Sequence, residues 1–223
     1  DGLWSKLREG IIGDGKPRVS GHIAYRAVLP IEAVEEELRP QAVVLWAGPK
    51  THLVHYPLRG GKLFNLVAVF HSDRYEEGWN VFGDTAELHE RFRDAHPAVK
   101  KLLEKVNAWK MWVLCDRPAI KNWTQGRITL LGDAAHPMLQ YLAQGGNMAL
   151  EDAVCLAEQI VASNHDYPAA FATYQQLRYL RTARVQLMAR VFGEIYHASG
   201  VNRELRNKVL GDYRAVILAG VGQ

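Results

Sequence analysis

Hydrophobic and polar residues follow two different periods along the chain, with strand-like runs in its first half and helix-like runs in its second. Short runs rich in β-branched and aromatic residues predict strands over residues 22–29, 42–47, 51–56, 62–71 and 109–115. From about residue 143 onward the pattern is helical, and a long helix is predicted over about 167–190 with Arg178, Arg181 and Arg184 on its exposed face. Because the predicted strands follow one another in hairpin order, we expect an antiparallel sheet covered on one side.

Shorter helices are predicted around these strands from their end signals. Residues 3–12 are expected to be helical, as are residues 30–39, where a proline opens the segment and glutamates follow it. Asp84 and Glu87 form a capping-box pattern before a further helix, and Pro97 opens another.

Residues 126–153 combine the elements of a cofactor-binding site. Apolar residues 128–131 predict a buried strand, Gly132 and Asp133 end it, and a helix begins near Gly145 after a loop of small residues. A carboxylate can accept hydrogen bonds from sugar-like hydroxyl groups, and N–H groups at a helix start can stabilise a group that gains negative charge. The alternative interpretation is that the glycines only serve turns and that Asp133 is a cap.

Composition narrows the function classes. The chain has 223 residues, of which 48% are hydrophobic and 23% are charged, as is ordinary for a globular protein. Its formal net charge of +3 comes without a dense basic run, so no nucleic-acid partner is expected. No apolar run approaches the ~20 residues of a membrane span, so we expect no membrane span and a cytoplasmic location. Cys115 and Cys155 are expected to be buried thiols.

Few polar residues suggest chemistry of their own. His52 and Tyr56 lie four apart on a predicted strand and therefore on one face, whereas His52 and His55 lie on opposite faces and cannot form a compact ligand pair. We expect no metal site, and the chain has no Cys-x-x-Cys or Gly-x-Ser-x-Gly motif. His52 and Tyr56 have a purely structural alternative, and Arg26 is expected either near a cofactor or at the surface.

The stretch around Gly132 resembles a known family. It is similar to the second FAD-binding motif of the single-component FAD-dependent aromatic hydroxylases, the flavin monooxygenases built like p-hydroxybenzoate hydroxylase. The matching positions are Gly126-Arg127, the run from Leu131 to Pro137, Gln144-Gly145, Asn147, and Glu151-Asp152-Ala153. We expect Glu151 and Asp152 to cap and orient the start of the helix rather than to act as acids.

The start of the chain resembles a second motif of the same family. Asp1-Gly2, followed by Ser5-x-x-Arg8, is similar to the family's Asp-Gly motif, which contributes to the FAD and NAD(P)H region. The Gly-x-Gly-x-x-Gly that should hold the FAD pyrophosphate is absent from these residues. The resemblance therefore implies that this chain is the C-terminal part of a longer enzyme.

The resemblance also implies a fold and a domain organisation. The fold is expected to be α/β, or α+β in the part present, with a Rossmann-like FAD-binding layer that is incomplete at the N-terminus, an antiparallel-sheet substrate domain and C-terminal helices. Residues 1–20 and 119–165 would belong to the FAD-binding domain, 21–118 to the substrate-binding sheet domain and 166–223 to the C-terminal helical region.

For the cofactor, the resemblance assigns roles around the loop that runs from Gly132-Asp133 to the helix near Gly145, called the Gly-Asp loop below. Asp133 would accept hydrogen bonds from the ribityl or pyrophosphate-proximal part of FAD, and Pro137 would pack near the isoalloxazine ring. Backbone groups over 144–147 would stabilise the N1/O2 side of the flavin as it gains electron density. The cofactor-binding residues implied are Asp1, Gly132, Asp133, Pro137, Gln144, Gly145, Gly146 and Asn147, and NADH or NADPH would be the co-substrate.

The resemblance further implies a small phenolic acid and O2 as substrates, because a flavin hydroperoxide attacks an electron-rich ring. His52 would help to deprotonate the phenol, Gln140 would orient it and Tyr56 would pack against the ring. His52 and Gln140 match the branch that hydroxylates 3-hydroxybenzoate to gentisate, and hydroxylation of salicylate to catechol is the nearest alternative. A different class, a non-catalytic flavoprotein remnant or binding module, also stays open. Family members are often dimers, so a homodimer is expected.

Overall fold

The computed structural model describes residues 1–74 and 81–219. Residues 75–80, within the expected substrate domain, and 220–223, at the end of the expected helical region, lie outside the described residues. The chain divides into two compact units, which are described separately below. The first unit comprises Asp1–Ser20 and Cys115–Gly193, and the second comprises Gly21–Leu114 and Glu194–Gln223. The assignment of domain names to residue ranges stays a prediction.

The second unit is built on an antiparallel sheet, as predicted. Its strand order is β2-β3-β4-β1-β5, and the β2/β3, β3/β4 and β1/β4 pairs are antiparallel. The strands are β1 (Arg18–Pro30), β2 (Val44–Gly48), β3 (Thr51–Leu58), β4 (Leu63–His71) and β5 (Lys110–Asp116). Each predicted strand of this part of the chain is therefore confirmed, with ends shifted by a few residues.

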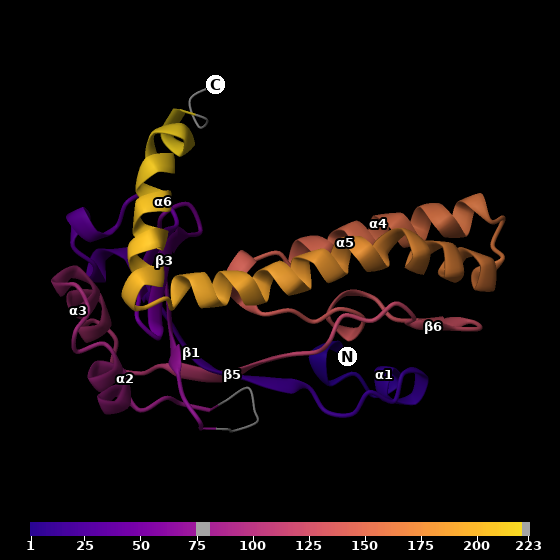
Figure 1. Ribbon diagram of the computed structural model, residues 1–223, viewed down its shortest axis with the longest axis horizontal. Coiled ribbons are helices and arrows are strands. Elements are labelled where there is room, and N and C mark those ends of the chain that lie inside the picture. Colours follow the sequence, from indigo (N-terminus) through magenta and orange to yellow (C-terminus); the bar gives the residue numbers. More distant parts are fainter. Residues whose placement is uncertain (75–80, 220–223) are drawn as a thin grey trace. The chain divides into compact units, whose positions relative to one another are not determined.

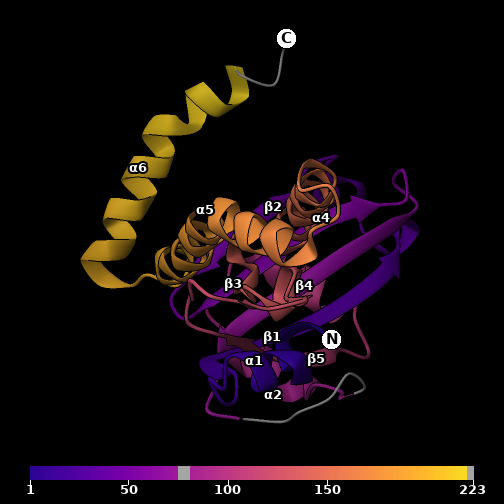
Figure 2. The same ribbon diagram turned by 90° about the vertical axis from the view of Figure 1, so that its right-hand side faces the viewer.

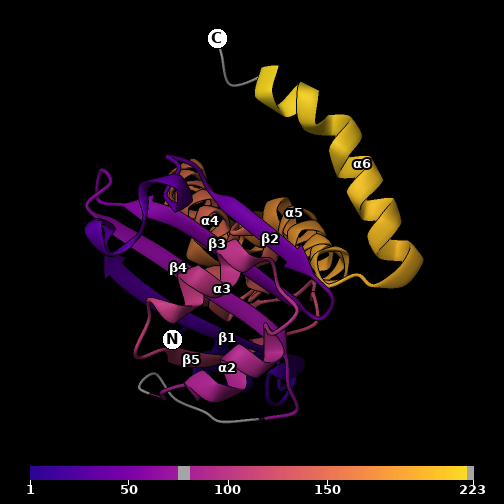
Figure 3. The same cartoon turned by 90° about the vertical axis from the view of Figure 1, so that its left-hand side faces the viewer.

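Two helices, α2 (Thr85–Arg91) and α3 (Pro97–Glu104), cover one face of this sheet (Figure 3). Asp84 caps α2, because its carboxylate accepts a hydrogen bond from the Ala86 N–H at 2.8 Å. Apolar side chains of alternate strand positions pack against the helices, which buries the core of this unit. The fully buried members include Ile23, Leu53, Phe64, Leu66, Phe70, Leu88, Leu102 and Leu103.

The predicted helix over residues 30–39 is wrong. The structure has two short 3-10 turns there, Ile31–Ala33 and Glu36–Leu38, separated by an extended Val34. Val34 is only 2% exposed, so the break places an apolar side chain in the core. Glutamates crowded on either side of Val34 also repel one another in a continuous helix, which favours the broken form.

The first unit is mainly helical. It contains α1 (Lys6–Ile11), α4 (Gly145–Ala162) and most of α5 (Tyr167–Tyr196), with short 3-10 turns η1 (Gly2–Trp4), η4 (Gly132–Ala134) and η5 (Gln140–Leu142). Figures 1 and 2 show α4 and α5 lying side by side. The end of α5 and the following α6 (Gly200–Ala219) belong to the second unit. None of the helices within the described residues is both long and apolar enough to span a membrane.

The buried strand predicted over 128–131 is also wrong. Only β7 (Ile128–Thr129) forms, and it pairs with β6 (Thr124–Gln125) in a two-stranded hairpin. Ile128 is 45% exposed and Leu131 is 36% exposed, whereas Leu130 is 2% exposed. Among the described residues this sheet has two strands, so the apolar run buries one side chain and leaves its neighbours accessible.

Candidate functional site

The Gly-Asp loop leaves the hairpin through a conformation that requires glycine. Leu131 is extended, Gly132 has φ +57°, and the chain then enters the η4 turn. A Cβ atom at Gly132 would lie 3.1 Å from the Cβ of Ala149 on α4. Gly132 therefore serves both the left-handed turn and the close approach of the loop to α4.

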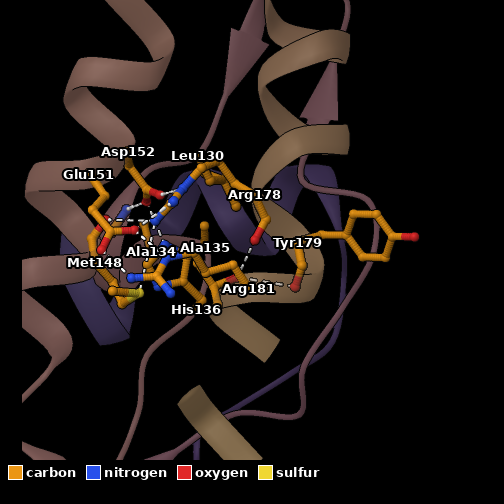
Figure 4. A network of polar contacts seen from close by, with 12 residues as sticks. Leu130, Ala134, Ala135, His136, Met148, Glu151, Asp152, Arg178, Tyr179 and Arg181 are labelled. Atoms are coloured by element: carbon orange, nitrogen blue, oxygen red, sulfur yellow. Dashed lines mark hydrogen bonds and ion pairs between the residues drawn. The ribbon is translucent and has the colours of Figure 1, made fainter. Parts of the chain in front are cut away.

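One buried carboxylate ties this loop to α4. Asp152 is fully buried, and its Oδ2 accepts the Gly132 N–H at 3.1 Å and lies 2.5 Å from the Nε2 of His136. Its Oδ1 accepts the Arg178 Nε–H at 2.7 Å, so the three side chains point toward one another (Figure 4). Burial alone would raise the pKa of Asp152, but the hydrogen bonds from His136 and Arg178 hold it below its usual value. The expectation that Asp152 caps the helix is wrong, because its side chain holds the loop instead.

The prediction that Arg178 lies on an exposed face is also wrong. Arg178 is only 7% exposed and pairs with both Asp152 and Glu151, the latter at 2.7 Å. Arg181 is more accessible and also pairs with Glu151, in line with its predicted exposure. From the sequence pattern alone, an arginine is expected at the surface. The pattern does not show that the carboxylate of Asp152, 26 positions away, offsets the cost of burying Arg178.

A second buried arginine holds the loop from the N-terminal segment. Arg8 is fully buried, and its Nη1 donates to the carbonyl oxygens of Ala134 at 3.0 Å and Ala135 at 2.7 Å. Its guanidinium also pairs with Asp14 at 2.6 Å. Burial raises the pKa of Asp14, but the contacts with Arg8 and the charge of Arg117 together hold it below its usual value. The buried guanidinium therefore has a carboxylate partner, which it shares with Arg117.

The Asp-Gly motif positions this arginine. Asp1 accepts a hydrogen bond from the Ser5 hydroxyl at 2.8 Å, and the Ser5 Oγ accepts the Arg8 backbone N–H at 3.0 Å. Further along, Gln186 of α5 donates from Nε2 to the Pro137 carbonyl at 2.9 Å. The Gly-Asp loop is thus held by α1, α4 and α5 together. Motif matching included Arg8 and Asp152 without their contacts to the loop, and it did not include Gln186.

Asp133 and the start of α4 form the accessible part of this arrangement. Asp133 is exposed, and its Oδ1 lies 3.7 Å from the position that a Cβ atom of Gly145 would occupy. Gln144 occupies the N-cap position without a side-chain capping hydrogen bond, and the space beside Gly146 is open. The predicted cofactor residues at 132–133 and 144–147 are therefore brought together, with a carboxylate beside uncapped helical N–H groups.

The second unit carries His52 and Tyr56 on the sheet face opposite α2 and α3. His52 is opposite Val69 and Tyr56 is opposite Asn65, so His52 and Tyr56 lie on one face, as predicted. His52 is 2% exposed, and its Nδ1 lies 2.7 Å from the Nε2 of His197. Burial, with a smaller contribution from His22, lowers the pKa of His52 to about 3. His52 is therefore a neutral imidazole near neutral pH.

Asn65 is a polar residue of the same face that sequence analysis missed. It is fully buried, and its Oδ1 accepts the Arg26 Nε–H at 2.8 Å. Arg26 itself is exposed. Asparagine within an apolar strand offers no sequence signal, because its position opposite Tyr56 depends on strand register.

Gln140 lies in the first unit, where it is exposed and begins the η5 turn. His52 and Tyr56 lie in the second unit. Their proposed meeting at one substrate stays a prediction.

The family match is extensive. Residues 1–188 match the family described as FAD binding domain. The chain is 50% identical over 212 residues to 3-hydroxybenzoate 6-hydroxylase 1 of Aquipseudomonas alcaligenes, covering 95% of this chain and 54% of that protein. It is 48% identical over 208 residues to 3-hydroxybenzoate 6-hydroxylase of Klebsiella oxytoca, covering 93% and 52%.

A solved structure with a similar fold supports the family match. A salicylate hydroxylase in a substrate complex has a TM-score of 0.82 and 27% identity, covering 97% of this chain and 59% of that one. The chain spans about half the length of the curated relatives named above. The Gly-Asp loop, α1, α4 and the arginines that hold the loop all lie within the family match. The chain belongs to the FAD binding domain family.

Proposed function

We propose that the whole protein is an FAD-dependent monooxygenase that hydroxylates a small phenolic acid with NADH or NADPH and O2. The observation that carries this proposal is the exposed Asp133 carboxylate beside the uncapped start of α4, on a loop held by Arg8 and Asp152. The relatives with 48% and 50% sequence identity are 3-hydroxybenzoate 6-hydroxylases, which supports 3-hydroxybenzoate as substrate and gentisate as product.

The residues present fit the flavin. Asp133 would accept hydrogen bonds from its ribityl chain, and the N–H groups of Gly145, Gly146 and Asn147 would face the pyrimidine side of the ring. Gly132, Pro137 and Gln144 would shape the loop around it. Bound FAD would supply the activation of O2. Asp1 would act through Ser5 and Arg8, because its carboxylate holds Ser5 in place.

We propose that His52 accepts the hydrogen bond of the substrate phenol and takes its proton. The low pKa of His52 keeps the ring neutral and able to accept. A buried imidazolium becomes acceptable when a phenolate forms beside it, because each charge offsets the burial cost of the other. Tyr56 would pack against the ring, and Gln140 would orient the phenol oxygen.

Replacement of His52 tests this role. In the full-length FAD-loaded protein, His52→Ala should slow hydroxylation about 100-fold or more while FAD stays bound, which is the usual size of a lost general base. His89→Ala on α2 is the matched control, because His89 lies outside the face that carries His52. An unchanged rate of product formation in His52→Ala would remove the proposed role.

Salicylate hydroxylation is the second candidate, supported by a structural neighbour at lower identity. Parallel assays with 3-hydroxybenzoate and salicylate separate the two, because the products are gentisate and catechol. NADH and NADPH are compared in the same assays. A homodimer and a cytoplasmic location stay predictions.

A further inference from the structure

Three histidines of the second unit, His22, His71 and His197, gather on the sheet face that carries His52, and are called the histidine cluster below. His22 and His71 are directly opposite each other on β1 and β4, with ring centroids 4.3 Å apart. His197 follows the end of α5, and its ring centroid lies 4.9 Å from each of the other two. One ring nitrogen from each residue can be chosen so that all three lie within 4.8 Å of one another.

The backbone holds the cluster in place. The Lys50 N–H donates to the His197 carbonyl at 3.1 Å, and the Lys50 carbonyl accepts the His71 N–H at 3.1 Å. Lys50 has φ +57°, so the turn before β3 fixes the segment that carries His197 against the end of β4. Residues far apart in the sequence are thereby joined through one turn.

The three imidazoles are in the form that binds metals. Burial lowers the pKa of His22 to about 4 and that of His197 to about 2, and it also lowers the pKa of His71. All three rings are therefore neutral near pH 7. The proton shared between the His71 Nε2 and the His197 Nδ1 would have to move to the other nitrogen of its ring when a metal ion binds. A set of imidazole nitrogens favours zinc, copper, nickel and cobalt over magnesium and calcium.

We propose that the histidine cluster binds one divalent ion of the zinc type through His22, His71 and His197, leaving a fourth coordination position open. Tetrahedral Zn–N bonds of about 2.0–2.1 Å place ligand nitrogens about 3.4 Å apart. The His71 Nε2 and His197 Nδ1 are 3.0 Å apart, and ligand nitrogens of the three residues lie within 4.8 Å of one another, so the imidazoles must rotate and the hydrogen bond must open for an ion to bind. The expectation of no metal site rested on the opposite faces of His52 and His55 and on the lack of a Cys-x-x-Cys motif, and neither observation involves the ligands proposed.

The charged groups around His71 are mixed. The Glu194 carboxylate raises the pKa of His71 and the Lys50 ammonium lowers it, while burial is the dominant influence. Glu194 would therefore stabilise a bound cation and Lys50 would oppose it.

The ion would also act on His52. If His197 binds metal through Nδ1, its Nε2–H must donate to the His52 Nδ1, which lies 2.7 Å away. The proton of His52 then lies on Nε2, so that nitrogen no longer accepts a hydrogen bond from a phenol. Metal binding to the histidine cluster should therefore inhibit hydroxylation. This consequence rests on the proposed function, whereas the proposal that the cluster binds a metal ion does not rest on it.

The test uses the full-length FAD-loaded protein after treatment with a chelator and buffer exchange. Zinc chloride is titrated by isothermal calorimetry, and retained zinc per subunit is measured by atomic emission after gel filtration. We expect one zinc ion per subunit, at least about 10-fold weaker binding in His22→Gln and His71→Gln, and unchanged binding in the control His89→Gln. No retained zinc, or equal binding in all variants, would overturn the proposal.

X-ray absorption at the zinc edge of the unmodified protein covers the case in which a variant does not fold. A shell of three imidazole nitrogens supports the site, and a shell of oxygen or sulfur ligands without imidazole overturns it. Neither readout depends on turnover, so a failure to hydroxylate 3-hydroxybenzoate leaves this result unaffected.

Discussion

The Gly-Asp loop of the first unit and the histidine-bearing sheet face of the second unit both bury polar side chains, but the buried groups are charged in the first and neutral in the second. Around the loop, buried Arg8 and Arg178 are each paired with a carboxylate, Asp14 and Asp152. On the sheet face, buried His22 and His52 each contact buried His197, and burial lowers the pKa of all three so that they are neutral. Fixed charges hold a cofactor loop in one shape, whereas neutral imidazoles can accept a proton or a metal ion. The comparison predicts different responses to mutation and to pH.

Removal of Asp152 should have the largest effect. Asp152→Ala leaves Glu151 as the remaining carboxylate partner of Arg178 and removes the buried acceptor of Gly132, His136 and Arg178, so the free energy of unfolding should fall by about 3 kcal/mol. Urea unfolding measures the loss. Glu158→Gln, at an exposed position of the same helix, is the control and should change stability by less than about 0.5 kcal/mol. A similar, small loss in both variants would mean that the buried pair does not hold the loop.

Acid should act first through a buried neutral histidine. His55 accepts a hydrogen bond from the Trp46 Nε1–H at 2.9 Å, and burial lowers its pKa from 6.5 to about 4. Because the folded pKa lies below the unfolded one, its contribution to stability is present above pH 6.5 and is lost as the pH falls toward 4. The free energy of unfolding should therefore fall by about 2 kcal/mol between pH 7 and pH 5 from this residue.

His55→Gln removes the titrating group and sharpens this test. Its urea unfolding should show a correspondingly smaller loss between pH 7 and pH 5 than the unmodified protein. Asp14 and Asp152 have lowered pKa values, so their contribution persists until the pH falls below the ordinary carboxyl range. Equal pH dependence in His55→Gln and the unmodified protein would show that His55 does not titrate as described.

The surface ion pair of Arg181 with Glu151 should contribute least to stability. Arg181 is 55% exposed at its side chain and contacts Glu151 at the surface. Arg181→Gln should therefore lower the unfolding free energy least of the three changes, and less at high salt, as measured by urea unfolding at two salt concentrations. A loss as large as that of Asp152→Ala would break the distinction between buried and exposed pairs.

The sequence predicted the elements whose pattern is local. The strands of the sheet, the Asp84 cap of α2 and the glycine that opens α4 follow from alternation, capping and turn residues. The helix over 30–39 failed because Val34 is drawn into the core, which overrides the propensity of its neighbours.

The candidate site was predicted in part. Asp133 and Gly145 were identified by a motif, and His52 with Tyr56 by strand period. Arg8 and Asp152 belong to the matched motifs, but their contacts could not be predicted. The local sequence gives no sign that Arg8 binds the carbonyl of Ala134, 126 positions away, or that Asp152 pairs with Arg178.

The most direct test of the central claim is product analysis with the full-length FAD-loaded protein. NADH or NADPH oxidation and O2 uptake are recorded with 3-hydroxybenzoate, and the product is identified by mass spectrometry. The account predicts gentisate in a one-to-one ratio with NAD(P)H consumed. Absence of any hydroxylated product, with FAD bound and 3-hydroxybenzoate present, would contradict it.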